Sequence, residues 1–176
     1  MLFHMMRSST FVKAIAFAAL VGWLAIDVYM GVADQLRGIS PIVLFQWDAS
    51  NIIGSTAFSD GLRSASLGLV FDLIVSIAWA ALCAVIMFRS ETARSHPIWF
   101  GALLGALVMF VMLWIIVPLG RAHQAPMSLS NFMIVLAGHT LFFGIPLAVT
   151  VRAALNAEQV GQVKKFWPTI KVGPPE

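Results

Sequence analysis

The chain has 176 residues, of which 60% are hydrophobic and only 11% are charged, and its mean hydropathy is +0.89. Soluble domains carry about 25% charged residues, so this composition excludes an ordinary soluble domain and indicates one integral membrane domain. The formal net charge of +3 does not indicate a nucleic-acid partner, because Lys and Arg stand at the ends of apolar segments. The expected surroundings are a lipid bilayer.

Four segments are long enough to cross the hydrocarbon core, which takes about 20 apolar residues. The predicted spans cover about 11–33, 65–88, 98–119 and 131–151. They form a transmembrane domain over 1–156, and 157–176 is expected to be a cytoplasmic tail. The predicted fold class is therefore all-α, an integral membrane four-helix bundle.

The first apolar segment has a second interpretation. Arg7 and Lys13 precede it and Gly31-Val32-Ala33 ends it, which is also typical of a cleaved signal peptide. The segment is longer than the apolar part of a signal peptide and contains Asp27. We therefore expect a retained span, with cleavage as the alternative.

The first loop, 34–64, contains an apolar stretch that is too short to span the membrane. We expect a short helix over about 41–53 that lies on the outer leaflet or re-enters it. Trp47, Asp48 and Asn51 mark this segment, and an indole suits the headgroup zone.

The distribution of basic residues predicts the orientation. Three stand in the first and third loops: Arg37, Arg63 and Arg121. Eight stand in the N-terminal segment, the second loop and the tail: Arg7, Lys13, Arg89, Arg94, Arg152, Lys164, Lys165 and Lys171. Cytoplasmic loops carry the excess of Lys and Arg, so both termini are expected in the cytoplasm.

Prolines and serines mark the limits of the last two spans. Pro97 opens the third span and Pro118 closes it, while Ser128 or Ser130 is expected to cap the fourth. Pro146 lies inside the fourth span, where we expect it to kink the helix.

Three ionisable side chains fall well inside the spans: Asp27, Asp72 and His139. At 1.5 Å per residue, each lies roughly 9–12 Å below the outer boundary. Ser76 shares a helix face with Asp72. An acid in mid-membrane costs about 2.5–3.5 kcal/mol and usually faces the bundle interior, so we predict a buried cluster of these four residues.

Two interpretations of this cluster remain open. In the first, carboxylate and imidazole satisfy each other and fix the helix register. In the second, they form a protonatable site with a transport-like or proton-responsive role, on an ion path or in a small-molecule pocket. The sequence predicts no catalytic residue, metal site or cofactor, and a membrane enzyme is the least supported function.

Gly101 and Gly105 form a small-xxx-small motif that permits close helix approach. An alternative function follows from them: a non-catalytic accessory or assembly subunit of a larger membrane complex, or a homo-oligomer. In that hypothesis the glycine face and the tail over 164–171 would contact the partner.

The third and fourth spans resemble those of the YagU-like family of small bacterial inner-membrane proteins. The resemblance covers about 40–152. It is carried by Gly101-Ala102-Leu103-Leu104-Gly105-Ala106-Leu107, Val117-Pro118-Leu119, Gly138-His139 and the loop run Trp47-Asp48-Ala49-Ser50-Asn51-Ile52-Ile53-Gly54. It implies four helices, a membrane-associated segment in the first outer loop and a bacterial inner-membrane location. In that family a histidine tends to stand where Asp72 falls here, and both residue types can carry a proton.

Overall fold

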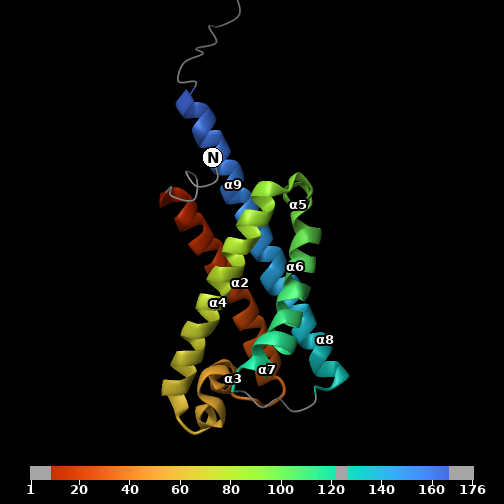
Figure 1. Cartoon of the computed structure of the whole chain (residues 1–176). Helices are drawn as coiled ribbons and strands as arrows, with labels where there is room; N and C mark the ends of the chain where they lie inside the picture. Colours follow the sequence, from red (N-terminus) through yellow and green to blue (C-terminus); the bar gives the residue numbers. More distant parts are fainter. Residues whose placement is uncertain (1–8, 122–126, 167–176) are drawn as a thin grey trace, which may run out of the picture.

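The chain folds as an all-α bundle with four helices long and apolar enough to cross a membrane (Figure 1). The computed structural model describes residues 9–121 and 127–166. The four spans run over Ile15–Gln35, Gly61–Arg89, Pro97–Leu119 and Leu129–Ala157. The prediction of a four-span membrane protein is confirmed.

The first span lies in α2 (Ser9–Gln35), and the second is α4 (Gly61–Arg89). The third span consists of α6 (Pro97–Val111), the π-helical turn η2 (Met112–Ile116) and α7 (Val117–Leu119). The fourth consists of α8 (Leu129–Ala137), the π-helical segment η3 (Gly138–Gly144) and α9 (Ile145–Phe166). Ser128 caps α8, since its Oγ accepts a hydrogen bond from the Asn131 backbone N–H at 3.2 Å.

Each π-helical segment ends shortly before a proline. Pro118 follows η2 and Pro146 follows η3. Proline has no N–H to donate to the previous turn, so the helix is free to widen there. The irregularity expected at Pro146 therefore takes the form of a π-helical segment, and a second one occurs in the third span.

The fourth helix is longer than the sequence analysis expected. It continues to Phe166, so the first part of the predicted tail, 157–176, is a continuation of α9. The cause is local, because 152–160 is rich in Ala, Leu, Glu and Gln, which favour helix. Residues 167–176 lie outside the described part of the chain.

The short helix predicted over 41–53 is confirmed as α3 (Pro41–Ile53). Its limits are encoded locally: Ser40 caps its first turn, and Gly54 ends it with a φ of +70°. A 3₁₀ turn, η1 (Gly54–Phe58), then leads to α4. The helix packs against the beginning of α4, at the end of the bundle opposite α5 (Glu91–Ser95) (Figure 1).

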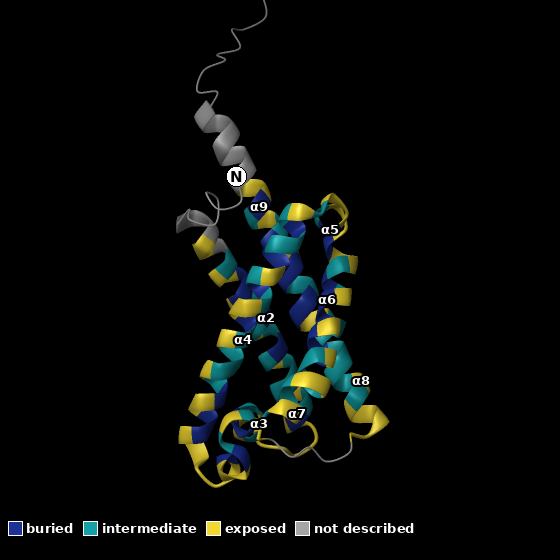
Figure 2. Cartoon of the chain, viewed as in Figure 1, coloured by how far each residue is buried: buried dark blue, intermediate teal, exposed yellow. Residues whose placement is uncertain are grey.

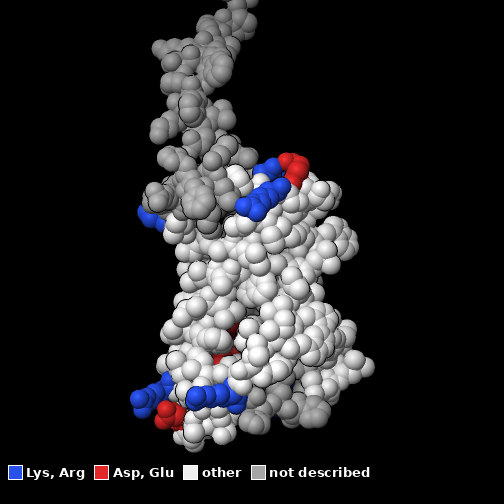
Figure 3. Space-filling model, viewed as in Figure 1, with Lys and Arg blue, Asp and Glu red and all other residues white. Residues whose placement is uncertain are grey.

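The packing follows a clear order. The helix α2 packs against both α4 and α9, and the third span packs against η3 and α9. Buried residues face inward, while apolar side chains such as Leu24, Ile74 and Leu103 point out of the bundle (Figure 2). Lys and Arg gather at its two ends and leave a largely uncharged belt between them, in which only a few acidic atoms are visible (Figure 3). This is the surface expected of a bundle in a bilayer.

The glycine motif of the third span is used inside the chain. A Cβ on Gly105 would lie 2.0 Å from the His139 carbonyl oxygen, and one on Gly144 would lie 2.0 Å from that of Gly101. Both Gly101 and Gly105 are buried against the fourth span. This corrects the idea that their face is offered to a partner protein.

Candidate functional site

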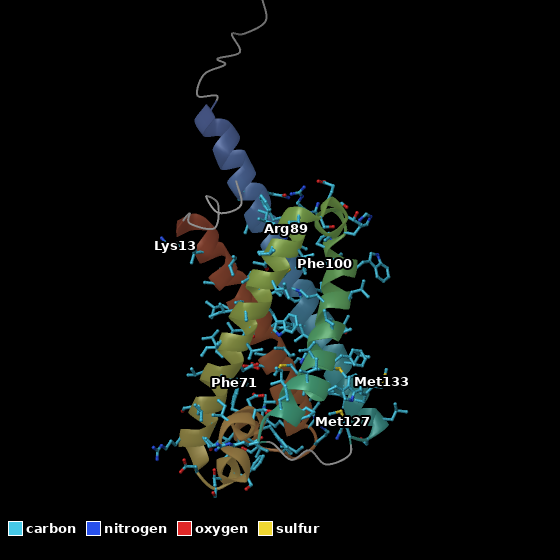
Figure 4. The ribbon with its side chains drawn as sticks, in the orientation of Figure 1. Lys13, Phe71, Arg89, Phe100, Met127 and Met133 are labelled. Atoms are coloured by element: carbon cyan, nitrogen blue, oxygen red, sulfur yellow. The ribbon has the colours of Figure 1, made fainter. Side chains whose placement is uncertain are left out.

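A cavity of about 390 Å³ lies between the four spans, at the end of the bundle that carries α3. Small-molecule sites usually measure about 300–1,000 Å³. Its walls contain four carboxyl groups, contributed by α2, α3 and α4: Asp27, Asp34, Asp48 and Asp72. Lys13 and Arg89 lie at the opposite end of the molecule (Figure 4). The cavity is therefore rich in acidic groups and far from that cationic end.

Helical spacing brings the polar groups to this space. On α2, Asp27 and Asp34 stand about two turns apart, and on α4, Asp72 and Ser76 stand one turn apart. Asp27 and Asp72 both line the cavity and lie close enough for each to affect the charge of the other. The first and second spans thus bring two acids to the same cavity.

The expected Asp/His cluster is not seen. Asp27, Asp72 and His139 are each half-buried and line the cavity, while Ser76 is buried beside them. Across 9–121 and 127–166, no hydrogen bond or ion pair joins His139 to either carboxylate. The imidazole has another partner, because its Nδ1 lies 2.9 Å from the Val135 carbonyl oxygen.

That contact defines the state of the imidazole. A carbonyl oxygen can only accept, so Nδ1 of His139 carries the proton and donates it to Val135. When the ring is neutral, Nε2 is then left as a proton acceptor. His139 therefore lines the cavity with a hydrogen-bond partner of its own and does not depend on Asp72 for one.

Among the described residues, Arg37 supplies the one guanidinium at the cavity wall, and this group is already engaged. Arg37 forms an ion pair with Asp34, donates from Nη1 to Oδ1 of Asn131 at 2.7 Å, and donates from Nε to the Ala33 carbonyl at 3.0 Å. These contacts tie the end of the first span to the beginning of the fourth. The charge of Arg37 is balanced by Asp34, which leaves Asp27, Asp48 and Asp72 without a cation among the residues described.

The sequence analysis missed the role of α3 in this cavity. The sequence predicts that Asp48 and Asn51 belong to a helix that lies on the outer leaflet or re-enters it, and in the structure both line the cavity together with Leu44 and Trp47. Their spacing of three and four residues places them on one helix face. That periodicity was present in the sequence, but it did not show that the face turns inward.

The carboxyl group of Asp48 is held in an unfavourable place for a charge. The Asp48 side chain is partly exposed because it borders the cavity, but elsewhere it is surrounded by protein. This burial raises the pKa of Asp48 well above its usual value of 3.8, and the charges of Asp72 and Asp27 raise it further. In the described segments, the charged or titratable side chains that share the cavity with it are Asp27, Asp34, Arg37, Asp72 and His139.

Replacing Asp48 by Asn is expected to stabilise the protein at neutral pH. Because the pKa of Asp48 is raised in the folded state, its carboxyl group ionises at a lower pH in the unfolded chain. The protonated carboxyl therefore contributes to stability at acid pH, and this contribution is lost as pH rises above 3.8. The amide has no such loss. Thermal unfolding of the purified protein should give a gap in Tm, mutant above wild type, that grows from acid to neutral pH. Asp60→Asn, at an exposed site, is the control; a constant gap would contradict the prediction.

Two polar atoms near the carboxylates have no partner. Nε1 of Trp23 and Oδ1 of Asn51 are buried and make no hydrogen bond within the described segments. The Trp23 side chain, one turn before Asp27, is nevertheless close enough to Asp72 to affect its charge. Its indole can therefore report on the state of that carboxyl group.

The other residues considered from sequence lie elsewhere. Cys83 is buried in the apolar core, and Trp114 is exposed and stacks on Phe110 with ring centroids 4.5 Å apart. His123 lies outside the described residues. No group of three or more His, Cys, Asp or Glu side chains in the described ranges is arranged to hold a metal ion.

No protein-family model matches the chain, and comparisons with curated proteins and with solved structures gave no significant match.

Proposed function

We propose that this chain is a proton-responsive membrane protein with a transport-like role, and that its cavity is the working site. The observation that supports this most strongly is the placement of three carboxyl groups, Asp27, Asp48 and Asp72, on one cavity without a balancing cation among the described residues. Intramembrane acids at a cavity are characteristic of ion and proton pathways.

Repulsion between the carboxylates is the physical reason why the cavity should respond to protons. Like charges within a few ångströms and away from bulk water disfavour ionising both groups. Asp27 and Asp72 are such a pair, and Asp48 adds a third charge across the cavity. The number of protons held there should therefore depend on pH and on any cation that enters. His139, with Nε2 available, supplies a further proton acceptor.

In this proposal the membrane is the bacterial inner membrane and both termini are cytoplasmic. Two features of the sequence support it. Lys and Arg are in excess in the N-terminal segment, the second loop and the tail, and the chain resembles YagU-like proteins. The described ends of the chain, at Ser9 and Phe166, lie at the same end of the bundle (Figure 1). The cavity would then lie in the outer half of the membrane.

The test uses Trp23 as an internal reporter. In protein reconstituted into lipid nanodiscs, tryptophan fluorescence should change with pH as the carboxyl groups titrate. Asp72→Asn should remove or displace this step, and Trp23→Phe should remove most of its amplitude, with helix content unchanged. Asp60→Asn, at an exposed site that does not line the cavity, should titrate as the wild type does.

A different result for Asp72→Asn would contradict this proposal. If Asp72→Asn lowered Tm but left the fluorescence titration unchanged, the carboxylates would serve only to hold the helices in register. The proposed proton response would then be wrong.

A further inference from the structure

The cavity opens between two spans rather than only at an end of the bundle. Within the described residues, the backbones of α4 and the third span come close at few points, whereas α4 packs closely on α2 and α3, and the third span on the fourth. In the space-filling view, acidic atoms are visible in a hollow of the uncharged belt, between α4 and the third span (Figure 3). In a bilayer this belt faces lipid, so the hollow is open sideways to the membrane.

The cavity behind this opening is lined by apolar side chains from both spans and by carboxyl groups. Val75 on α4 and Met112, Leu113 and Val117 on the third span line the cavity. Phe143 of η3 also lines it. An aromatic side chain in the lining of an acidic cavity favours a cation, because the faces of aromatic rings attract cations. The space of about 390 Å³ is also far larger than a single inorganic ion requires.

We propose that the cavity binds a lipophilic organic cation, a quaternary ammonium or phosphonium centre that carries apolar groups, which reaches it sideways from the bilayer between α4 and the third span. This inference rests on the proposed function of the same cavity and adds the chemical class of its ligand. The cationic group lies among Asp27, Asp48 and Asp72, and the apolar body lies toward Val75 and Met112. Because the cation replaces the charge that a proton supplied, its binding releases protons.

A matched pair of probes separates charge from hydrophobicity. Radiolabelled tetraphenylphosphonium, a lipophilic cation, and tetraphenylborate, its anionic counterpart, are incubated with the full chain in phosphatidylcholine nanodiscs. Empty nanodiscs supply the lipid background. We expect saturable binding of the cation alone, stronger as pH rises, and accompanied by proton release in weakly buffered solution.

Two variants test the site and one serves as control. Asp72→Asn should weaken binding roughly tenfold or more, because it removes a charge from the base of the cavity. Val75→Trp should also weaken it, since the indole occupies space in the cavity wall. Ile74→Trp adds the same indole on the neighbouring position, which is 59% exposed and points out of the bundle, and should bind as the wild type does.

Several outcomes would overturn the inference. Equal binding of tetraphenylborate, an equal loss in Ile74→Trp, or equally strong binding of hydrophilic tetramethylammonium would each contradict a lipophilic-cation site with sideways access. If tetraphenylphosphonium did not bind while the pH titration of Trp23 fluorescence persisted, the ligand class would be wrong and the proposed function would stand. Loss of both responses would remove the proposed function as well.

Discussion

Replacing Gly105 by Ala is expected to destabilise the bundle by about 3 kcal/mol or more, at the upper end of the usual cost of overpacking. The added Cβ would lie 2.0 Å from the His139 carbonyl oxygen, 2.7 Å from its carbonyl carbon and 2.9 Å from the Thr140 Cα. All three are backbone atoms, so no side chain can rotate away. The third and fourth spans must separate.

If the third and fourth spans separate, the part of the cavity wall that carries His139 also moves. Thermal unfolding in detergent, or steric trapping in bicelles, should show a large loss of stability for Gly105→Ala. The matched control is Gly31→Ala in α2, where an added Cβ meets nothing within 4 Å. Alanine favours helix over glycine by about 1 kcal/mol, so Gly31→Ala should be neutral or slightly stabilising. Equal losses in both variants would contradict the close approach at Gly105.

Replacing Gly68 by Ala is expected to detach α3 from α4 while the four spans remain folded. A Cβ at this position would lie 1.8 Å from the Phe45 carbonyl oxygen and 2.9 Å from the Ala49 backbone nitrogen. The contacts that remain include the Gln46 Nε2 hydrogen bond to the Gly61 carbonyl, at 3.3 Å. One such bond contributes about 1 kcal/mol, which is too little to hold α3 against the overlap.

Labelling of a cysteine at position 50 measures this displacement. Ser50 is 1% exposed and lies on the buried face of α3 with Gln46 and Ala49. In a Cys83→Ala background, Ser50→Cys should react with a soluble maleimide several-fold faster when Gly68→Ala is also present. Ser66→Ala, on the exposed face of α4, should leave the rate unchanged. An unchanged rate in Gly68→Ala, with helix content retained, would contradict the docked position of α3.

The Gly68→Ala variant also connects the fold to the proposed function. Since Asp48 reaches the cavity only because α3 is docked, its displacement should weaken the binding of tetraphenylphosphonium. The pH titration at Trp23 should change less, because Trp23, Asp27 and Asp72 stand on α2 and α4. A selective loss of this kind would assign separate roles to the two parts of the cavity wall.

The sequence alone determined the elements, because their causes are local. Runs of apolar residues predict the four spans, and Ser40, Pro41 and Gly54 set the limits of α3 within its own sequence. The prolines at 118 and 146 likewise determine where the helices widen, since the missing N–H acts on the turn before it. The π-helical form of these segments, the irregularity before Pro118 and the continuation of the fourth helix to Phe166 were not foreseen from the sequence.

The tertiary structure decided which polar groups meet, because that depends on how helices rotate and approach one another. The glycines at 101, 105 and 144 bring the third and fourth spans into backbone contact, and η3 changes the helical register beside His139. His139 then bonds Val135 rather than a carboxylate. The docking of α3 at Gly68 adds Asp48 to Asp27 and Asp72. Such placements depend on long-range packing, which periodicity within one helix does not specify.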